Sequence, residues 1–242
     1  MEFHQKKQFL IGGIGATLFF LIFGVIFGGR IYGYFFTPPE EAVDAPAIDL
    51  LWVKAFPGEG DGVWDAAARI RNPDAARGVR RAGYEFALLD AGGTVLAVRT
   101  GEAFLRRDEA KYVVENSIES SIEPARVRFT LREATWVEDT EAADGPFILQ
   151  RHTLTRGELS GVVLNDTALG FGTVHVAAVL FDADRDPIRA RRTSFARMTA
   201  REERAFTLRW SNSGAATAAE IEISTNLFDA TNYLPQEPES NF

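Results

Sequence analysis

The hydrophobic and polar positions divide the chain into two regions with different patterns. Residues 9–29 form an uncharged, apolar run, and a helix of that length reaches about 31 Å, enough to cross the hydrocarbon core of a bilayer. The run exceeds the apolar segment of about 7–15 residues in a cleaved signal peptide, and bulky aromatic residues follow it instead of a cleavage site. The pattern predicts an uncleaved transmembrane signal anchor with an outer aromatic interface over residues 9–36.

The charges beside this run predict its orientation. Lys6 and Lys7 lie in the tail of residues 1–8, whereas Arg30 stands alone before the acidic linker of residues 37–47. Because lysine and arginine remain preferentially in the cytoplasm, the N-terminus is expected inside and the rest of the chain outside. The predicted location is the cell membrane, with a single pass and an extracytoplasmic C-terminal region.

After the anchor the apolar residues recur with a period of two. Val127, Phe129 and Leu131 alternate with polar residues, and so do Ile221 and Ile223. This alternation is typical of half-buried antiparallel strands. Residues 174–181 are apolar at nearly every position, which predicts a central strand.

Two segments of this region repeat each other at an offset of 92 to 93 residues. The corresponding runs are 68–72 with 161–165, 86–90 with 178–182, and 127–131 with 219–223. A duplication of about 90 residues made of short strands predicts two sandwiches, over 48–138 and 148–234, joined by an acidic linker at 139–147 and followed by a tail at 235–242. The expected fold is all-β: two tandem immunoglobulin-like antiparallel β-sandwiches after one N-terminal transmembrane helix.

The segment Phe86-x-Leu88-Leu89-Asp90 resembles the signature of the FxLYD-domain family, and Asn72 and Gly93-Thr94-Val95 fit the same pattern. The second copy departs from it, with Ala178 and Phe181 in place of the phenylalanine and tyrosine. The resemblance implies a β-sandwich module common on membrane-anchored and secreted bacterial proteins. It carries over no catalytic residue, because the family has none established.

Composition excludes several kinds of chemistry. The chain has no cysteine, which rules out disulfides, thiol catalysis and thiolate metal sites. Its net charge of −8 comes from acids in the predicted connectors and tail, which are expected to be solvated: Glu40, Glu41, Asp44, Asp139, Glu141, Asp144, Glu237 and Glu239. No basic patch dominates either copy, so nucleic-acid binding is not expected.

Histidine offers no evident site. His4, His152 and His175 are the three in the chain, and a metal centre or a histidine-assisted nucleophile needs partners that converge on one point. His175 alternates with Val174 and Val176 in a predicted strand. We expect no catalytic residue, metal or cofactor, and no small-molecule substrate.

Polar runs in the loops have both a structural and a chemical interpretation. Asp182, Asp184 and Asp186 are spaced like the start of a calcium loop but lack its later ligands, so a hairpin turn is favoured. Asn165 begins a glycosylation sequon, yet its equivalent Asn72 does not, and a backbone-capping asparagine explains both.

Two further sets of residues are assigned to surface and core. The stripe of arginines at 189, 191, 192, 197, 201 and 204 is interspersed with acids and is expected to form a mixed solvated surface and not an anion site. Large aromatic residues dominate sandwich cores, so core and edge packing is expected of Trp52, Trp64, Trp136 and Trp210.

The anchor contains glycines spaced four apart, a pattern that allows two membrane helices to approach closely. Glycine is also frequent in membrane helices without such a role. The candidate helix–helix contact consists of Gly24, Gly28, Gly29 and Gly33.

Three classes of function remain. The favoured one is a non-catalytic binding or accessory protein that lies in the membrane bilayer and engages an envelope or membrane protein through its sandwiches. The alternative is a self-associating spacer or stalk that uses the glycine-rich helix. The third is an enzyme with a site dispersed over the sequence, which is disfavoured because no catalytic motif is present.

Overall fold

The computed structural model describes residues 47–140, 145–211 and 216–235. Residues from Pro46 onward form one compact unit, separate from Met1–Ala45. The predicted anchor, with Gly24, Gly28, Gly29 and Gly33, therefore lies outside the described residues. Within them, no helix has both the length and the apolar character needed to cross a bilayer.

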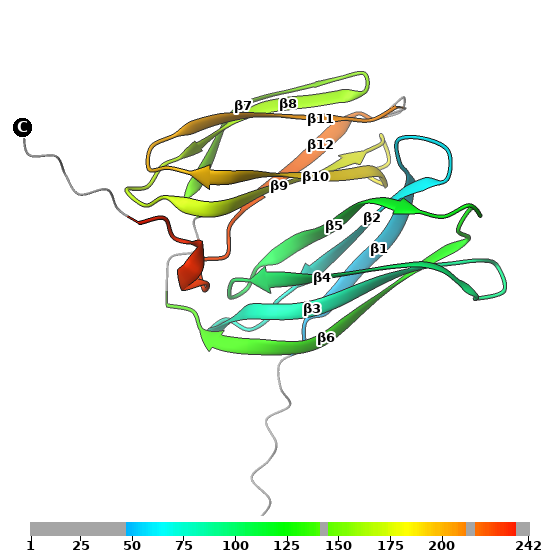
Figure 1. Ribbon diagram of the computed structural model, residues 1–242, viewed down its shortest axis with the longest axis horizontal. Coiled ribbons are helices and arrows are strands. Elements are labelled where there is room, and N and C mark those ends of the chain that lie inside the picture. The colour runs from blue at the N-terminus through cyan, green and yellow to red at the C-terminus, as the bar shows by residue number, and fades with distance from the viewer. Residues whose placement is uncertain (1–46, 141–144, 212–215, 236–242) are drawn as a thin grey trace, which may run out of the picture. The chain divides into compact units, whose positions relative to one another are not determined.

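The first six strands form two antiparallel sheets. Their order is β1-β2-β5 in one sheet and β4-β3-β6 in the other (Figure 1). The strands are β1 (Asp49–Pro57), β2 (Val63–Arg71), β3 (Arg77–Leu89), β4 (Val95–Leu105), β5 (Ala110–Glu119) and β6 (Arg126–Glu138).

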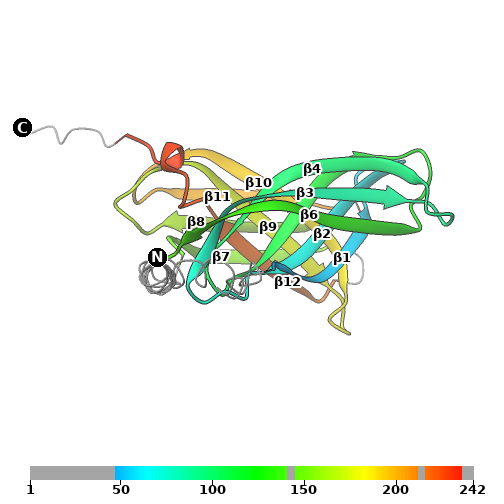
Figure 2. The same ribbon diagram turned by 90° about the horizontal axis from the view of Figure 1, so that it is seen from below.

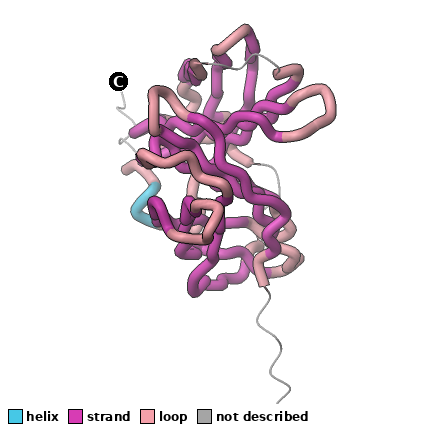
Figure 3. The backbone as a smooth tube through the Cα atoms, turned by 90° about the vertical axis from the view of Figure 1, so that its right-hand side faces the viewer, coloured by secondary structure: helices cyan, strands magenta, loops and turns pink. Residues whose placement is uncertain are grey.

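The next six strands repeat this arrangement. Their sheets have the orders β11-β8-β7 and β10-β9-β12. The strands are β7 (Phe147–Thr155), β8 (Glu158–Asn165), β9 (Phe171–Phe181), β10 (Pro187–Met198), β11 (Glu203–Arg209) and β12 (Ala218–Ser224). The described chain then passes through the short 3₁₀ helix η1 (Ala230–Asn232), next to the start of β9 (Figure 2). Strands account for most of the described backbone (Figure 3), so the prediction of an all-β sandwich fold is confirmed.

The two copies match strand for strand, and their registers match as well. Phe86 lies opposite Phe129 in the first copy, and Ala178 lies opposite Ile221 in the second. Both residues of the second pair follow those of the first by the offset of 92 found in the sequence. The equal topology and register support the duplication.

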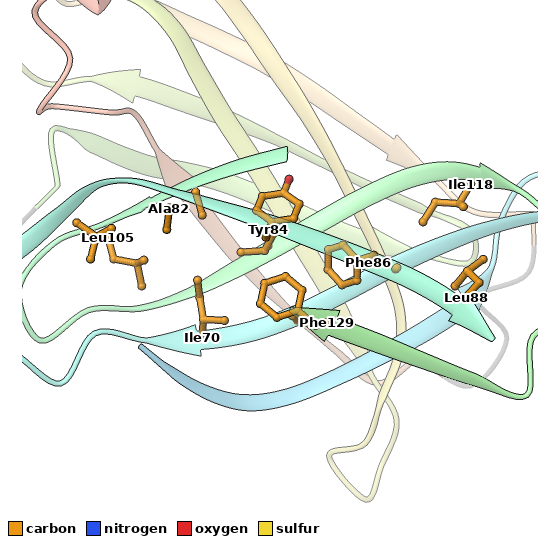
Figure 4. Packing of buried hydrophobic residues seen from close by; sticks show 13 residues of the cluster. Ile70, Ala82, Tyr84, Phe86, Leu88, Leu105, Ile118 and Phe129 are labelled. Carbon is orange, nitrogen blue, oxygen red and sulfur yellow. The ribbon is translucent and has the colours of Figure 1, made fainter. Parts of the chain in front are cut away.

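Each sandwich has its own apolar core. In the first, the rings of Tyr84, Phe86 and Phe129 pack together, with 4.8 Å between the centroids of Phe86 and Phe129 (Figure 4). Ala178 and Leu180 take the equivalent inward positions in the second core. The segment 86–90 and its equivalent 178–182 therefore supply core side chains in both copies.

The tryptophans pack as expected. Trp210 is buried in the core of the second sandwich, and Trp64 and Trp136 pack against the core of the first. Trp52 packs against a third apolar cluster.

This third cluster lies between the sandwiches, where sheet β1-β2-β5 meets sheet β10-β9-β12 (Figure 1). β2 and β9 are central strands, and each is covered on both faces. On β2, Ala66 and Ala68 point into the core of the first sandwich, whereas Ala67 points into the shared cluster. On β9, Ala178 points into the core of the second sandwich, whereas Val179 points into the shared cluster. An apolar run without alternation is typical of a strand buried on both faces, as predicted for residues 174–181.

Candidate functional site: the junction between the two sandwiches

Charged residues surround the shared apolar cluster and join the sandwiches. Arg192 Nη2 on β10 donates to both carboxylate oxygens of Glu115 on β5, each at 3.1 Å. Tyr84 Oη donates to Glu115 Oε1 at 2.5 Å, and burial together with this bond raises the pKa of the Tyr84 hydroxyl. The backbone of Arg192 also exchanges two hydrogen bonds with the Asn116 side chain, at 2.7 and 3.1 Å.

A second ion pair crosses the junction at Arg191. Its Nη2 lies 3.1 Å from Asp65 Oδ2 on β2, and its Nη1 lies 2.7 Å from Glu59 Oε1. Burial raises the pKa of the Asp65 carboxyl, while the Ser117 N–H at 2.9 Å and the Arg191 guanidinium oppose that rise. A buried charge of this kind is tolerated only because it is paired and hydrogen-bonded.

On the other side of the cluster, Tyr112 on β5 contacts β12. Tyr112 Oη donates to Glu220 Oε2 at 2.5 Å, and the Arg69 guanidinium lies 5.0 Å from the centroid of the Tyr112 ring. Burial and the bond to Glu220 raise the pKa of the Tyr112 hydroxyl.

These contacts correct two expectations, for the arginine stripe and for Asp139, and show which way the acids of β12 face. The arginine stripe is not wholly a solvated surface, because the Arg191 side chain is only 12% exposed and is paired across the junction. Glu220 and Glu222 alternate with isoleucines as predicted, but they face the first sandwich. Asp139 is not part of a solvated connector: its side chain is 1% exposed and forms an ion pair with Arg106 at 2.8 Å.

A small cavity of about 80 Å³ lies in this junction, where β4 and β5 face β9, β10 and β12. Its lining includes Phe104, Lys111, His175, Glu222 and Ser224. It adjoins a wider cleft of about 780 Å³, with which it shares Phe104 and His175. Clefts between domains are common positions for ligand sites, and this one contains several titratable groups.

Lys111 is the most unusual residue of the cavity. It is 6% exposed, and its Nζ has no hydrogen-bond partner among the described residues. The Nζ atom lies 3.3 Å from the centroid of the Phe104 ring, a cation–π contact. Burial lowers the pKa of the Lys111 amine, an effect that the charges of Glu109 and Glu222 oppose.

Glu222 and His175 are also perturbed. Burial raises the pKa of the Glu222 carboxyl to about 7, against the influence of Lys111 and of the Tyr112 N–H, which donates to Glu222 Oε2 at 2.9 Å. Burial, reinforced by the positive charges of Lys111 and Arg192, lowers the pKa of His175 to about 4. At neutral pH His175 is therefore uncharged and Glu222 is near its midpoint, a state typical of groups at functional sites.

The other candidates from the sequence have structural roles. The Asn72 side chain donates to the carbonyls of Arg77 and Arg106, at 2.7 and 2.8 Å, and Asn165 donates to Leu169 and Thr199 at the same distances. The prediction of a capping asparagine is confirmed in both copies.

Asp182 Oδ1 accepts from the N–H groups of Asp184 and Asp186, at 3.0 and 2.9 Å, so the hairpin-turn interpretation is also confirmed. His152 is exposed on β7, whereas His175 lines the cavity on the face opposite Val174 and Val176. In the part of the chain that the structure describes, no group of three or more histidines, cysteines or acids is arranged to hold a metal ion.

The sequence analysis missed Lys111 and Glu222. One feature of the sequence could have indicated Lys111: it begins the run Lys111-Tyr-Val-Val114, whose apolar residues fall on both faces of a strand. Such a run is typical of a strand that is buried on both faces. Glu222 gave none, because its alternation with isoleucine is also the pattern of a solvated strand face.

Comparisons with known proteins add little to this site. No protein-family model matches the sequence, and no curated protein matches it significantly. A solved structure of red sea bream transglutaminase covers 72% of this chain at 10% identity and a TM-score of 0.24, and the chain spans 29% of that enzyme.

The CBD12 region of CALX1.2 covers 66% of the chain at 13% identity and a TM-score of 0.22, with 73% of its own length matched. The calcium-binding domain CBD12 of CALX1.1 covers the same share at 14% identity and a TM-score of 0.19, with 72% of its length matched. The class of protein is defined by its own strands: an all-β chain with two joined sandwiches.

Proposed function

We propose that this chain is a single-pass, membrane-anchored binding or accessory protein of a prokaryotic cell envelope, non-catalytic, with two FxLYD-like, immunoglobulin-like sandwiches outside the cytoplasmic membrane. It acts as a subunit of a membrane-associated assembly. The apolar run at residues 9–29 and the FxLYD-like segment support the location, and the structure of the junction supports the mode of action.

The junction is the observation that carries this proposal. Apolar contacts, with ion pairs such as Arg192–Glu115 and Arg191–Asp65, join the sandwiches into one compact unit. Sheet edges of both copies are then held in one fixed arrangement, which lets a partner contact both at once without ordering a linker. Apolar residues on these edge strands are available for such contacts, for example Val98 on β4 (48% exposed) and Ile148 on β7 (45% exposed).

Site-specific photo-crosslinking in cells tests the proposal. A photoreactive residue is placed at Val98 or Ile148 in the full-length chain, with Arg81, exposed on the central strand β3, as the matched control. We expect the edge positions, and not the control, to give one discrete crosslink to a membrane or envelope protein. Equal and diffuse crosslinking from all three positions would contradict the proposal.

The same experiment separates the alternative, a self-associating stalk. That alternative predicts a crosslink between two copies that disappears when Gly24 and Gly28 are replaced by leucine, because bulk prevents close helix approach. A crosslink to a different protein that survives this double substitution supports the accessory-subunit proposal.

A further inference from the structure

Lys111 lacks the acceptor that a buried ammonium group requires. A lysine is almost never fully buried without a partner, and transfer of its charge from water is strongly unfavourable unless hydrogen bonds compensate. The Phe104 ring covers one side of Nζ, yet the three N–H donors find no acceptor among the described residues. The side chain lines the inner cavity, so a bound group there is positioned to accept from it.

Two neighbouring side chains have unused hydrogen-bonding capacity as well. Among the described residues, Glu222 makes one hydrogen bond, in which Oε2 accepts the Tyr112 N–H, so Oε1 is unused. Ser224 lines the same cavity, and its hydroxyl makes no hydrogen bond to another described residue. Glu222 near its midpoint at neutral pH supplies an O–H donor in its protonated form.

We propose that the inner cavity binds the carboxylate group of a small organic acid, held by the Lys111 ammonium, the protonated Glu222 carboxyl and the Ser224 hydroxyl. The cavity volume of about 80 Å³ accommodates a group the size of two or three water molecules, each of which takes about 30 Å³ in the liquid. This size suits a carboxylate, while the remainder of the ligand extends into the wider cleft.

The charges of the site favour a monoanion over a phosphate. A carboxylate brings one negative charge, which favours the protonated form of Lys111 against the effect of burial. It also shares a proton with Glu222, as paired carboxyl groups do. A dianion would bring a second negative charge close to the carboxylates of Glu109 and Glu222, which already act on Lys111. Repulsion between these like charges disfavours a dianion. The wider cleft offers polar groups for the rest of the molecule, including Arg80, Asn226 and Asn232.

This inference rests on the cavity and is independent of the proposed envelope function. It also departs from the expectation of no small-molecule ligand, which took no account of the junction. Binding of an organic acid and binding of a protein partner use different surfaces, and one can fail without the other.

The chain allows a direct spectroscopic test because it contains four lysines, of which Lys54 and Lys111 lie in the described region. The full-length protein, with lysine side chains labelled with ¹³C and ¹⁵N, is titrated with acetate in detergent micelles. Loss of a signal in the Lys111→Met variant identifies Lys111, and methionine keeps the apolar packing against Phe104. Lys54→Met, at an exposed position on β1, is the matched control.

We expect acetate to shift the Lys111 signal with saturation and to leave Lys54 unchanged. Lys111→Met should weaken acetate binding, measured by calorimetry, about tenfold or more, as expected for a charge-assisted hydrogen bond. Glu222→Gln, which keeps an N–H donor, should retain binding that Glu222→Ala loses.

Three results would overturn the assignment. An unchanged Lys111 signal at saturating acetate would show that the cavity takes no carboxylate. Equal shifts with chloride or phosphate would show a general anion effect. Equal weakening in Lys54→Met and Lys111→Met would place the binding elsewhere.

Discussion

Glu222 and His175 give the folded protein two opposing responses to pH, and removing either one should reveal the other. The pKa of Glu222 is raised from 4.5 to about 7, and that of His175 is lowered from 6.5 to about 4. Both residues line the same cavity. Each shift affects stability, because a proton that is bound in the folded state but not in the unfolded state, or the reverse, makes the free energy of unfolding depend on pH.

The signs are opposite. Between pH 4.5 and 7 the folded state keeps the Glu222 proton while the unfolded state has lost it, so this residue makes stability fall as pH rises. Between pH 4 and 6.5 the unfolded state carries the His175 proton while the folded state does not, so this residue makes stability rise with pH. At about 1.36 kcal/mol per pH unit, each effect amounts to about 3 kcal/mol at most, and water entering the cleft reduces both.

The assay is urea unfolding of the full-length protein followed by tryptophan fluorescence, at a series of pH values from 4.5 to 7. The quantity of interest is the difference in unfolding free energy between variant and wild type, because the other titrating groups largely cancel in it. For Glu222→Gln this difference should increase with pH, and for His175→Asn it should decrease.

The groups that face these residues enter the same comparison. Lys111, Glu109 and Arg69 act on Glu222, and Lys111 and Arg192 act on His175. Lys111→Met should therefore raise the pKa of Glu222 further and let His175 gain its proton at a higher pH. Stability differences that do not change with pH in either variant would refute the reasoning.

The remaining predictions concern the fold that holds this site. Asn72→Ala and Asn165→Ala should each lower the free energy of unfolding by about 2–3 kcal/mol in urea titrations, since each leaves two strand-end carbonyls without a donor; losses below about 0.5 kcal/mol would mean that water replaces the amides. Ala67→Glu places a charge in the apolar cluster between the sandwiches and leaves the core of each sandwich unchanged. Because the cluster couples the sandwiches, calorimetry of this variant should show two thermal transitions. A single transition in that variant would show that the sandwiches remain coupled without the cluster.

The sequence predicted most of the fold because the fold depends on local patterns. Alternation in residues 126–132 and 220–223 predicted strands that became β6 and β12, and the apolar run of 174–181 predicted the central strand β9. The capping asparagines and the aspartate turn were predictable for the same reason, as each side chain bonds to backbone nearby in sequence or at the ends of adjoining strands.

The candidate site depends on contacts between the copies, which no local pattern reports. A polar residue that alternates with isoleucine has the same sequence signature whether it faces water or a second sandwich. Glu220 and Glu222 therefore resembled surface residues, although Tyr112 of the other copy bonds to both. Arg191 was misassigned for the same reason, because its partner Asp65 belongs to the other copy. Asp139 was misassigned because its partner Arg106 is in the same copy but 33 residues away in sequence, and such pairing leaves no periodic pattern.

The duplication relates β12, which contributes Glu222 and Ser224 to the cavity, to a strand of different character in the first copy. The junction joins non-equivalent faces: sheet β1-β2-β5 of the first copy and sheet β10-β9-β12 of the second, whose counterpart in the first copy is β4-β3-β6. The equivalent outer face of the first copy carries Arg128, Thr130 and Arg132 on β6, where the second copy has Glu220, Glu222 and Ser224 on β12. Long, charged arginine side chains keep that face in water, whereas the shorter acids and serine of β12 fit against β5. Glu222 and Ser224, which line the cavity beside Lys111, therefore have residues of different chemistry at the equivalent positions of the first copy.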